Sequence, residues 1–483
     1  MIKKSSIIVL LLTGLILPVC QWRAAADGVN SGLAEFCDRR PCDDLIKNRI
    51  GCFMPPAPPA NCRDKDCRTP GVAVAIIKDD KVIFEDAFGF ANIEKADGEI
   101  TPNTVFDLAS LTKQFTAAGI MMLIEDPAIK LKNGYRLTVD TSLSDILDDF
   151  PPAQGRDIIL ADLLTHQSGL PDYIAEYQRH HDFDFKKNLK QGKPTWYETM
   201  DHRNKREEIT NEGAIKLIAE AEPRRGKAPG TDFQYSNSGY VVLARIIEKL
   251  SREKSYRKFM EERIFKPLGM TNTSVFDEDS GKITNHAFPY RQDHGRYFVM
   301  EGYTPINFVY GDGNIHSTLD DMIKWVQALD NIEHGRSGAL LKRETLVTAF
   351  QSTRLREDMT KPLRYGFGWF VARKNTETDG PTIRVIYHGG DWFGFHSYMV
   401  NGRIEKSGTP VCELTMIVLS NFEPELHDQS QNRPCQIARE LSTFFWGENK
   451  AQNIIRDDNK MFCGSEPKPT CEAPRPCPKT TGN

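Results

Sequence analysis

The stretch Val105-Phe106-Asp107-Leu108-Ala109-Ser110-Leu111-Thr112-Lys113-Gln114-Phe115 changes, at its centre, from an extended pattern to a helical one. The residues before Ser110 form a short extended run. After Ser110, apolar side chains recur at helical spacing, at Phe115, Ala118, Met121, Met122 and Ile124. The stretch therefore predicts an extended segment that leads directly into an apolar helix, with Ser110 at the first turn.

Strand-like runs lie at both ends of the surrounding domain, and helical patterns such as Val241 to Leu250 fill its middle. The predicted strands are Gly71 to Ile77 and Val82 to Phe90, which the turn pair Asp79-Asp80 separates, then Gly366 to Ala372, Ile383 to Tyr387, Gly394 to Val400 and Leu414 to Leu419. A last helix fits Gln436 to Phe445, and residues 174–212 read as a polar surface excursion. This order predicts an α+β fold, in which N- and C-terminal strands share one antiparallel sheet, helices flank it and a mainly helical subdomain is inserted.

The composition excludes several classes of protein. The chain has 483 residues, with 62 Lys and Arg against 66 Asp and Glu, which is too even a balance for a dedicated nucleic-acid binder. Hydrophobic residues make up 40% and charged residues 27%, a mixture that excludes a disordered chain and a polytopic membrane protein. We therefore expect a globular protein with no nucleic-acid partner.

The first 26 residues have the pattern of a secretory signal peptide. Lys3 and Lys4 precede the apolar run Ile7 to Pro18, and Ala24-Ala25-Ala26 offers a small-residue cleavage site. The run is shorter than the ~20 residues that a membrane span needs. We expect an exported protein, periplasmic or secreted, with no membrane span in its mature form. Lipoprotein anchoring at Cys20 is the less favoured alternative, because Val19 is bulky for such a site.

Ten cysteines remain after the predicted signal peptide, five near each end of the chain. They are Cys37, Cys42, Cys52, Cys62, Cys67, Cys412, Cys435, Cys463, Cys471 and Cys477. An even number in an exported chain predicts disulfides, and five at each end require at least one bridge between the ends if all ten pair. The predicted parts are a signal peptide (1–26), a Cys-rich segment (27–69), a catalytic domain (70–449) and a Pro/Cys-rich tail (450–483).

Three short motifs carry the candidate chemistry. In the first, Ser110 and Lys113 lie three residues apart, so on a helix the amine can reach the hydroxyl and activate it as a nucleophile. The same S-x-x-K spacing also occurs at Ser251, Ser255 and Ser465, but only Ser110 follows an extended segment and opens an apolar helix.

The second motif is Tyr235-Ser236-Asn237, on a connector after the turn Pro229-Gly230. A tyrosine can act as base and acid, and an amide two residues away can fix a carbonyl; a purely structural tyrosine is the alternative. The third motif, His388-Gly389-Gly390, follows a predicted strand. Its glycines would let an edge strand bring N–H groups close to an oxyanion, whereas the alternative is a simple hairpin turn.

Together, and in this chain order, the motifs resemble those of the β-lactamase-related serine hydrolases, which include class C β-lactamases, D-alanyl-D-alanine carboxypeptidases, D-aminopeptidases and esterases. Further similar stretches are residues 163–171, Pro267-Leu268-Gly269-Met270, Gly311-Asp312-Gly313 and residues 365–369. The resemblance spans about Pro70 to Gly447. It implies an acyl-enzyme mechanism without a metal or another cofactor.

The resemblance also implies roles. Ser110 would attack the acyl carbonyl, Lys113 and Tyr235 would share the proton transfers, and Asn237 would hold the acyl amide of the substrate. His388 would support Tyr235. Asp391 follows Gly389 and Gly390 in the sequence, and its backbone N–H would form the oxyanion hole together with the N–H of Ser110.

The chain departs from many β-lactamases where it has His388 and Gly389 in place of the Lys and Thr that bind a substrate carboxylate. We therefore expect a hydrolase of small esters or amides. The alternatives are a D-amino-acid peptidase or carboxypeptidase, a class C-like β-lactamase, or a non-catalytic binding or scaffold module on a penicillin-binding fold. The expected partner is a small-molecule or short peptide substrate, and the oligomeric state stays open.

Overall fold

The computed structural model describes residues 43–53, 68–148, 150, 157–181, 209–221, 228–277, 280, 283–293, 296–300, 308–351, 363–375, 382–406, 409–423, 434, 436–438 and 441. The predicted signal peptide, the tail 450–483 and most of the predicted helix 436–445 lie outside this part of the chain. So does most of the predicted surface excursion 174–212.

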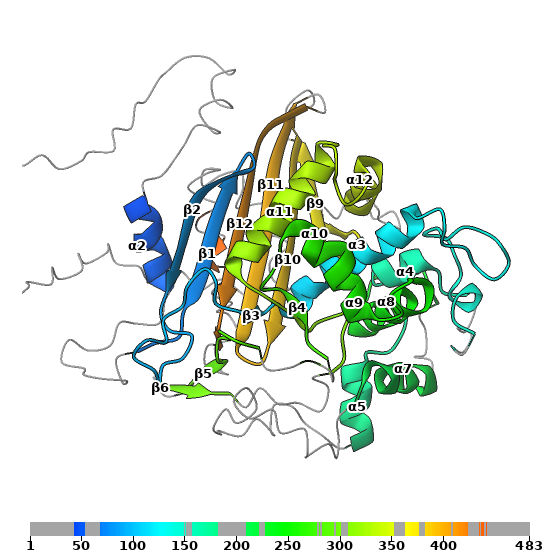
Figure 1. Ribbon diagram of the computed structural model, residues 1–483, viewed down its shortest axis with the longest axis horizontal. Coiled ribbons are helices and arrows are strands. Elements are labelled where there is room, and N and C mark those ends of the chain that lie inside the picture. Colours follow the sequence, from blue (N-terminus) through cyan, green and yellow to red (C-terminus); the bar gives the residue numbers. More distant parts are fainter. Residues whose placement is uncertain are drawn as a thin grey trace, which may run out of the picture.

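A seven-stranded antiparallel sheet forms the centre of the protein, in the order β2-β1-β12-β11-β10-β9-β8 (Figure 1). Strand β1 lies between β2 and β12, and Val72 is opposite Ser420. The prediction that strands from both ends of the domain share one sheet is thus confirmed, and with it the α+β fold. The strands are β1 (Val72–Lys78), β2 (Lys81–Phe88), β8 (Leu363–Tyr365), β9 (Phe370–Asn375), β10 (Thr382–Trp392), β11 (Phe395–Lys406) and β12 (Thr409–Ser420).

Helices from the middle of the chain gather beside this sheet, on the right in Figure 1, while α11 packs on β1 and β12. Helix α3 is enclosed on all sides: its residues Thr112 to Met121 are all buried, and they include the polar side chains of Lys113 and Gln114. The helices are α2 (Asp43–Phe53), α3 (Thr112–Glu125), α4 (Leu160–Leu164), α5 (Tyr173–His181), α7 (Asn211–Glu220), α8 (Asn237–Leu250), α9 (Tyr256–Met260), α10 (Lys266–Leu268), α11 (Leu319–Glu333) and α12 (Arg343–Gln351).

Two small sheets complete the described part of the fold. One joins β3 (Phe106–Asp107) to β7 (Ile315–Ser317) and β4 (Ser274–Val275), and therefore holds the segment before Ser110 against residues far along the chain. The other contains β5 (Tyr290–Asp293), β6 (Arg296–Val299) and β13 (Phe422–Glu423).

Local sequence explains the turns between the strands. Asp79 and Asp80 have φ values of 46° and 68°, the left-handed conformation that a two-residue hairpin requires at both central positions. The predicted strand Gly366 to Ala372 is wrong at its start. Gly366 N–H bonds Trp369 O at 2.7 Å, and Gly368 has φ 83°, so the chain turns there before β9 begins at Phe370.

His388-Gly389-Gly390 lies inside strand β10, so the interpretation of these glycines as a hairpin turn is wrong. The turn comes later, at Phe393 and Gly394, which have φ values of 35° and 85°. Strand β10 is an interior strand of the sheet, which corrects the expectation of an edge strand. However, β9 pairs with it only as far as Tyr387, so one side of β10 is open from His388 onward.

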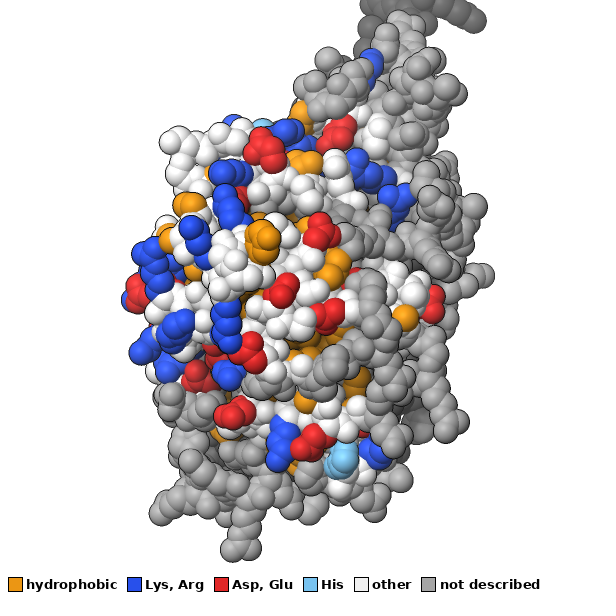
Figure 2. Space-filling view, turned by 90° about the vertical axis from the view of Figure 1, so that its right-hand side faces the viewer, with side chains coloured by type: hydrophobic (Ala, Val, Ile, Leu, Met, Phe, Trp, Pro, Cys, Tyr) orange, Lys and Arg blue, Asp and Glu red, His pale blue; other side chains and the backbone are white. Residues whose placement is uncertain are grey.

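The ends of the described chain add to the same core. Ile46 and Ile50 of α2 are buried in it, and Cys412 on β12 is disulfide-bonded. The side chains of the other nine cysteines lie outside the described part, so the predicted bridge between the ends stays a prediction. Among the described residues, no helix has the length and apolarity to cross a membrane. On the face that Figure 2 shows, basic and acidic side chains are interspersed.

Candidate active site

Ser110 lies in a 3₁₀ turn, Ala109–Leu111, between β3 and α3. Ala109 has φ 48°, a left-handed conformation that is strained for a residue with a side chain. The Asp107 carboxylate holds this turn, since its Oδ1 accepts a 2.7 Å hydrogen bond from Ala109 N–H. The prediction that Ser110 opens the helix is confirmed apart from this turn, because the α-helical part of the segment begins at Thr112.

The Lys113 amine is the centre of the site. Its side chain is completely buried, and Nζ donates to Ser110 Oγ at 2.9 Å, to Asn237 Oδ1 at 2.9 Å and to the carbonyl oxygen of Asp312 at 2.8 Å. An ammonium has three donors, and these three acceptors use them all. A neutral amine could instead accept the Ser110 proton and keep the other two bonds. The first two motifs are thus brought together, although more than a hundred residues separate them.

Asn237 is the first residue of α8, and its backbone N–H donates to Asp172 Oδ2 at 2.9 Å. Tyr235 lies just before this helix, and its ring centroid is 5.1 Å from Lys113 Nζ. The connector between the two residues therefore places a phenol and a carboxamide around one amine, as the Tyr-x-Asn spacing predicts.

His166 and Tyr365 form the walls around Tyr235. The His166 ring lies 4.2 Å from the Tyr235 ring, and its Nδ1 accepts a 3.2 Å hydrogen bond from Ser236 N–H, which fixes the connector. Burial, with Lys113 nearby, holds the pKa of His166 well below its usual range, so its imidazole is neutral. From the sequence alone, His166 could be predicted only to lie near the site, since no spacing rule links it to Tyr235.

His388 is completely buried on β10, where its Nε2 and the Tyr365 hydroxyl form a 2.9 Å hydrogen bond. Its Nδ1 lies 2.6 Å from the Gly389 carbonyl oxygen, and the ring centroids of His388 and Tyr235 are 6.1 Å apart. Burial, with the nearby Lys113, lowers the pKa of His388 to about 3. His388 is therefore neutral near pH 7, and it cannot replace a lysine as the anchor for a substrate carboxylate.

Gly390 allows β10 to pass against the turn that carries Ser110. A Cβ added at Gly390 would lie 2.1 Å from Leu108 O and 3.3 Å from Ala109 Cβ. No side chain fits this approach, so only glycine lets the backbone of β10 and the Ser110 turn lie side by side. The same approach brings Asp391 to the pocket in front of Ser110.

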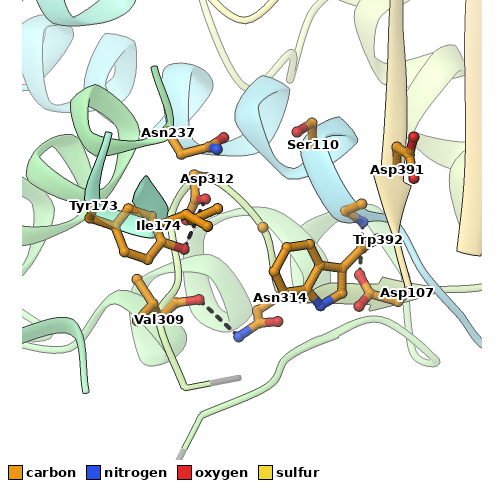
Figure 3. A pocket seen from close by; sticks show the side chains of 12 residues that line it. Asp107, Ser110, Tyr173, Ile174, Asn237, Val309, Asp312, Asn314, Asp391 and Trp392 are labelled. Atoms are coloured by element: carbon orange, nitrogen blue, oxygen red, sulfur yellow. Dashed lines mark hydrogen bonds between the residues drawn. The ribbon is translucent and has the colours of Figure 1, made fainter. Parts of the chain in front are cut away.

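A pocket of about 110 Å³ opens in front of Ser110, and Asn237, Tyr173, Trp392 and Asn314 are among the residues that line it (Figure 3). Three aspartates also line it: Asp107, Asp312 and Asp391. Burial raises the pKa of Asp107 to about 7 and that of Asp312 to about 6. Sequence reasoning singled out Asp391 for its backbone N–H and missed the two buried acids, although Gly311-Asp312-Gly313 stood out as a similar stretch, because only the tertiary fold brings residues 107, 312 and 391 together.

The site combines a nucleophile, an amine that can take its proton, an amide and an open strand edge. Those are the parts that acyl transfer needs. The described residues include no group of three or more side chains that could hold a metal ion.

Replacing Asp312 with asparagine is expected to stabilise the protein at neutral pH. Burial raises the Asp312 pKa from 3.8 to about 6, so between these values the folded state holds the proton more tightly than the unfolded state. Its contribution to stability therefore falls as pH rises through this window and stays low above it. Asparagine does not ionise, and the gain should approach about 3 kcal/mol at high pH.

Thermal unfolding of D312N and wild type at about pH 8 and about pH 5 measures this effect, with the larger gain expected at the higher pH. The matched control is Asp148→Asn. That carboxylate is exposed and forms ion pairs with Lys132 and Lys249, so this change should give no gain. Equal gains for D312N at both pH values would contradict the prediction.

Comparison with known proteins places this geometry in a family. The Beta-lactamase family model matches residues 46–435. Penicillin-binding protein 4* of Bacillus subtilis is 30% identical over 354 residues, which are 71% of this chain and 66% of that protein. D-aminopeptidase of Brucella ovis is 28% identical over 362 residues, which are 74% of this chain and 58% of that protein. The chain thus spans less than two-thirds of the length of these curated relatives.

Solved structures support the fold. The octameric penicillin-binding protein homologue from Pyrococcus abyssi superimposes with a TM-score of 0.59 at 23% identity, covering 88% of this chain and 79% of that one. The family match covers most of the chain and includes Ser110, Lys113, Tyr235 and the open edge of β10. This protein therefore belongs to the β-lactamase family of serine hydrolases.

Proposed function

We propose that this protein is an exported hydrolase that cleaves small esters or amides through an acyl-enzyme on Ser110. The observation that carries the proposal is the position of the Lys113 amine, which bridges Ser110 Oγ, Asn237 Oδ1 and the Asp312 carbonyl. A serine that lines a pocket and is in direct contact with a buried amine forms an activated nucleophile.

In acylation, neutral Lys113 takes the Ser110 proton while its other two hydrogen bonds hold it in place. Ser110 Oγ then forms a bond to the carbonyl carbon, and the carbonyl oxygen becomes an oxyanion. Backbone N–H groups of Ser110 and Asp391 stabilise that charge, which is the role of the open edge of β10. As the tetrahedral intermediate collapses, the bond to the alcohol or amine breaks, and the leaving group takes up the proton from Lys113 or Tyr235.

In deacylation, Tyr235 assists a water molecule that attacks the acyl carbon. The proton of the water passes through Tyr235 or Lys113 to Ser110 Oγ as the bond between Oγ and the acyl carbon breaks, which releases the acid and restores the serine. His166 and His388 are neutral, so the Lys113 amine, 5.1 Å from the Tyr235 ring centroid, is the group beside Tyr235 with which it can share the proton transfers. Asn237 Oδ1 is occupied by Lys113, which leaves the Nδ2 donors for the acyl amide of a substrate. The Tyr365 hydroxyl is hydrogen-bonded to His388 Nε2, and the Tyr365 ring packs edge-on against the Tyr235 ring. We therefore propose that His388 supports Tyr235 through Tyr365.

A second candidate function is hydrolysis of amino-acid amides or peptides, as the name D-aminopeptidase of one relative suggests. It needs the same nucleophile and differs only in what fills the pocket. A class C-like β-lactamase is less favoured, because the neutral His388 and the hydrogen side chain of Gly389 provide neither the charge nor the hydroxyl that would bind a carboxylate.

We expect short-chain esters to be hydrolysed with higher kcat/KM than a cephalosporin or a peptide ending in D-Ala-D-Ala. A site that lacks polar partners for a substrate carboxylate loses selectivity for anionic substrates, while the acyl-transfer groups remain. The measurement is kcat/KM across p-nitrophenyl esters, D-amino-acid amides, a chromogenic cephalosporin and the D-Ala-D-Ala peptide on one preparation. If the cephalosporin or the D-Ala-D-Ala peptide exceeds the best ester about tenfold, the substrate assignment is wrong. No turnover of any substrate would favour a non-catalytic scaffold.

Export is proposed from the N-terminal pattern and from the ten cysteines of the predicted mature chain. We expect the oxidised mature protein to contain almost no free thiol and at least one bridge between its two terminal clusters. Peptide mapping without reduction, on protein recovered from the cell envelope or the medium, tests both points. Five unpaired thiols, tightly bound zinc or an uncut N-terminus would contradict them. Reduction should lower the thermal midpoint, since each bridge typically contributes ~2–4 kcal/mol.

A further inference from the structure

We infer that three buried side chains form a strut behind the oxyanion hole: Asp107, His316 and His286. The strut sets the positions of the two donors of the hole, the N–H groups of Ser110 and Asp391. Within it, Asp107 serves as a hydrogen-bond acceptor and not as a charge. The three act through these donors and are therefore positioning residues. The inference rests on the proposed function and adds residues to it.

One end of the strut is the turn that carries Ser110. Asp107 Oδ1 accepts a 2.7 Å hydrogen bond from Ala109 N–H (Figure 3), and Ala109 is held at φ 48°. This left-handed conformation costs energy for a residue with a side chain, so it persists only where other contacts hold it. Ser110 N–H belongs to the next peptide group, and its direction therefore depends on the Asp107 bond.

His316 and His286 continue the strut from Asp107, and all three side chains are buried. Strand β3 pairs with β7 so that Asp107 is directly opposite His316, and Asp107 Oδ2 lies 3.9 Å from His316 Nε2. On the other side of the ring, His316 Nδ1 lies 2.9 Å from His286 Nε2, within hydrogen-bond distance. His286 is anchored in turn, because Val105 makes 2.9 Å backbone hydrogen bonds with both of its chain neighbours.

The other end of the strut reaches the hairpin that carries Asp391. The His286 ring packs edge-on against the Phe395 ring, and their centroids are 5.5 Å apart. Phe395 opens β11 and is the partner of Trp392 on β10, one residue beyond Asp391. A shift of His286 would therefore move the hairpin, and with it the Asp391 N–H.

The protons of the two histidines indicate what Asp107 meets. Burial lowers the pKa of His286 well below its usual range and that of His316 to about 3, so both rings are neutral near pH 7. A backbone hydrogen bond at Ala287 opposes the shift of the His286 pKa, and a bond that favours the charged ring is one that the ring donates. His286 Nδ1 therefore carries its proton, and His286 Nε2 accepts from His316 Nδ1. This leaves His316 Nε2 without a proton on the side of Asp107.

A charge on Asp107 gains nothing from this neighbour, because His316 Nε2 turns a lone pair toward Asp107 Oδ2. Burial raises the pKa of Asp107 to about 7. Oδ1 can nevertheless accept from Ala109 N–H in both the ionised and the protonated form. An amide oxygen at the same position could do the same, and this separates the role of an acceptor from that of a charged group.

The test compares Asp107→Asn with Asp107→Ala. Asparagine keeps an oxygen that can accept from Ala109 N–H, whereas alanine removes it. Asp107→Ala should lower kcat for a p-nitrophenyl ester about tenfold or more and leave KM within about threefold, because the hole acts on the transition state. Asp107→Asn should restore kcat to within about threefold of the wild-type value.

Asp126→Ala is the matched control. Asp126 Oδ1 accepts a 2.9 Å bond from Ala128 N–H, the same bond two residues along the chain, but this pair is exposed at the end of α3. The control should keep wild-type kcat. If Asp107→Ala also keeps it, or if Asp107→Asn is as inactive as Asp107→Ala, the inference is wrong while the proposed ester hydrolysis stands.

A double variant tests whether the strut acts as one unit. His286→Ala should lower kcat in the same direction as Asp107→Ala. Because either change already breaks the strut, the double variant should lose less than the product of the two single losses. A loss equal to that product would mean that the two residues act independently, and it would overturn the inference.

Hydrogen exchange followed by mass spectrometry tests the strut without turnover. In Asp107→Ala, peptides that cover residues 106–111 and 391–395 should exchange at least about tenfold faster than in wild type, whereas Asp107→Asn should exchange like wild type. Unchanged exchange in Asp107→Ala would overturn the inference. If the wild-type protein neither hydrolyses an ester nor is acylated on Ser110, the proposed function fails, yet the exchange rates still decide whether the strut exists.

If Asp107→Ala does not fold, the other two single variants decide. Wild-type exchange in Asp107→Asn, together with faster exchange of both peptides in His286→Ala, would support the strut. Any other combination would overturn it.

Discussion

Replacing Ser110 with alanine should reduce ester hydrolysis by about a thousandfold or more, because it removes the atom that forms the acyl-enzyme. The fold should tolerate the change, since Ser110 lies in a 3₁₀ turn that Asp107 and Ala109 hold through other atoms. Intact mass after treatment with a fluorophosphonate or an activated ester should show one adduct on the wild-type protein. Peptide mapping should place the adduct on Ser110.

Ser251→Ala is a suitable control, because Ser251 opens another S-x-x-K match and lies in the loop that follows α8, away from the pocket. That variant should keep both the label and the activity. An adduct that persists in S110A, or full hydrolysis by S110A, would show that another nucleophile is at work.

Gly390→Ala is expected to lower kcat/KM at least about a hundredfold, comparable to the loss of an oxyanion donor. A methyl group at this position would meet Leu108 O at 2.1 Å, which is backbone and cannot rotate away. Either β10 or the Ser110 turn must shift, and both carry a donor of the proposed oxyanion hole. Because the variant overpacks a buried contact, we also expect it to lose ~1–3 kcal/mol of stability.

The control for this variant is Gly51→Ala, where an added Cβ meets nothing within 4 Å. Gly51 lies in α2, and alanine favours a helix, so the control should be at least as stable as wild type. Steady-state kinetics and thermal unfolding of both variants measure the difference. Wild-type activity in G390A would mean that the close approach of β10 to the Ser110 turn has no part in catalysis.

Sequence reasoning was most successful where a short spacing carries the geometry. The three residues from Ser110 to Lys113 span less than one helical turn, and their contact follows directly from helical geometry. The Asp79-Asp80 hairpin was predictable for a similar reason, because both residues tolerate the left-handed conformation. The pairing of Tyr235 and Asn237 with Ser110 depended on resemblance to a family, since no local rule connects these segments.

The failures came where tertiary contacts override local signals. Two adjacent glycines normally indicate a turn, but at Gly389-Gly390 they continue β10, because Gly390 packs against Leu108. The acids of the pocket were missed for a related reason. Asp107 and Asp312 come together only when β3 pairs with β7, just beyond Asp312. The sequence placed His166 near the site but not against Tyr235, because the link between them is a ring contact and a hydrogen bond to the Ser236 backbone.

The pairing of β1 with β12 sets the order in which the nascent chain can complete its fold. Val72 leaves the ribosome long before its partner Ser420, so β1 can pair with β2 early but must wait for β12 on its other side. Until then, the apolar run Val72–Ile77 has one unpaired backbone edge, and such edges promote association between chains. Folding of the catalytic domain is thus completed only after β12 has been synthesised. A chain that is truncated before Thr409 would leave one backbone edge of β1 unpaired and prone to association with other chains.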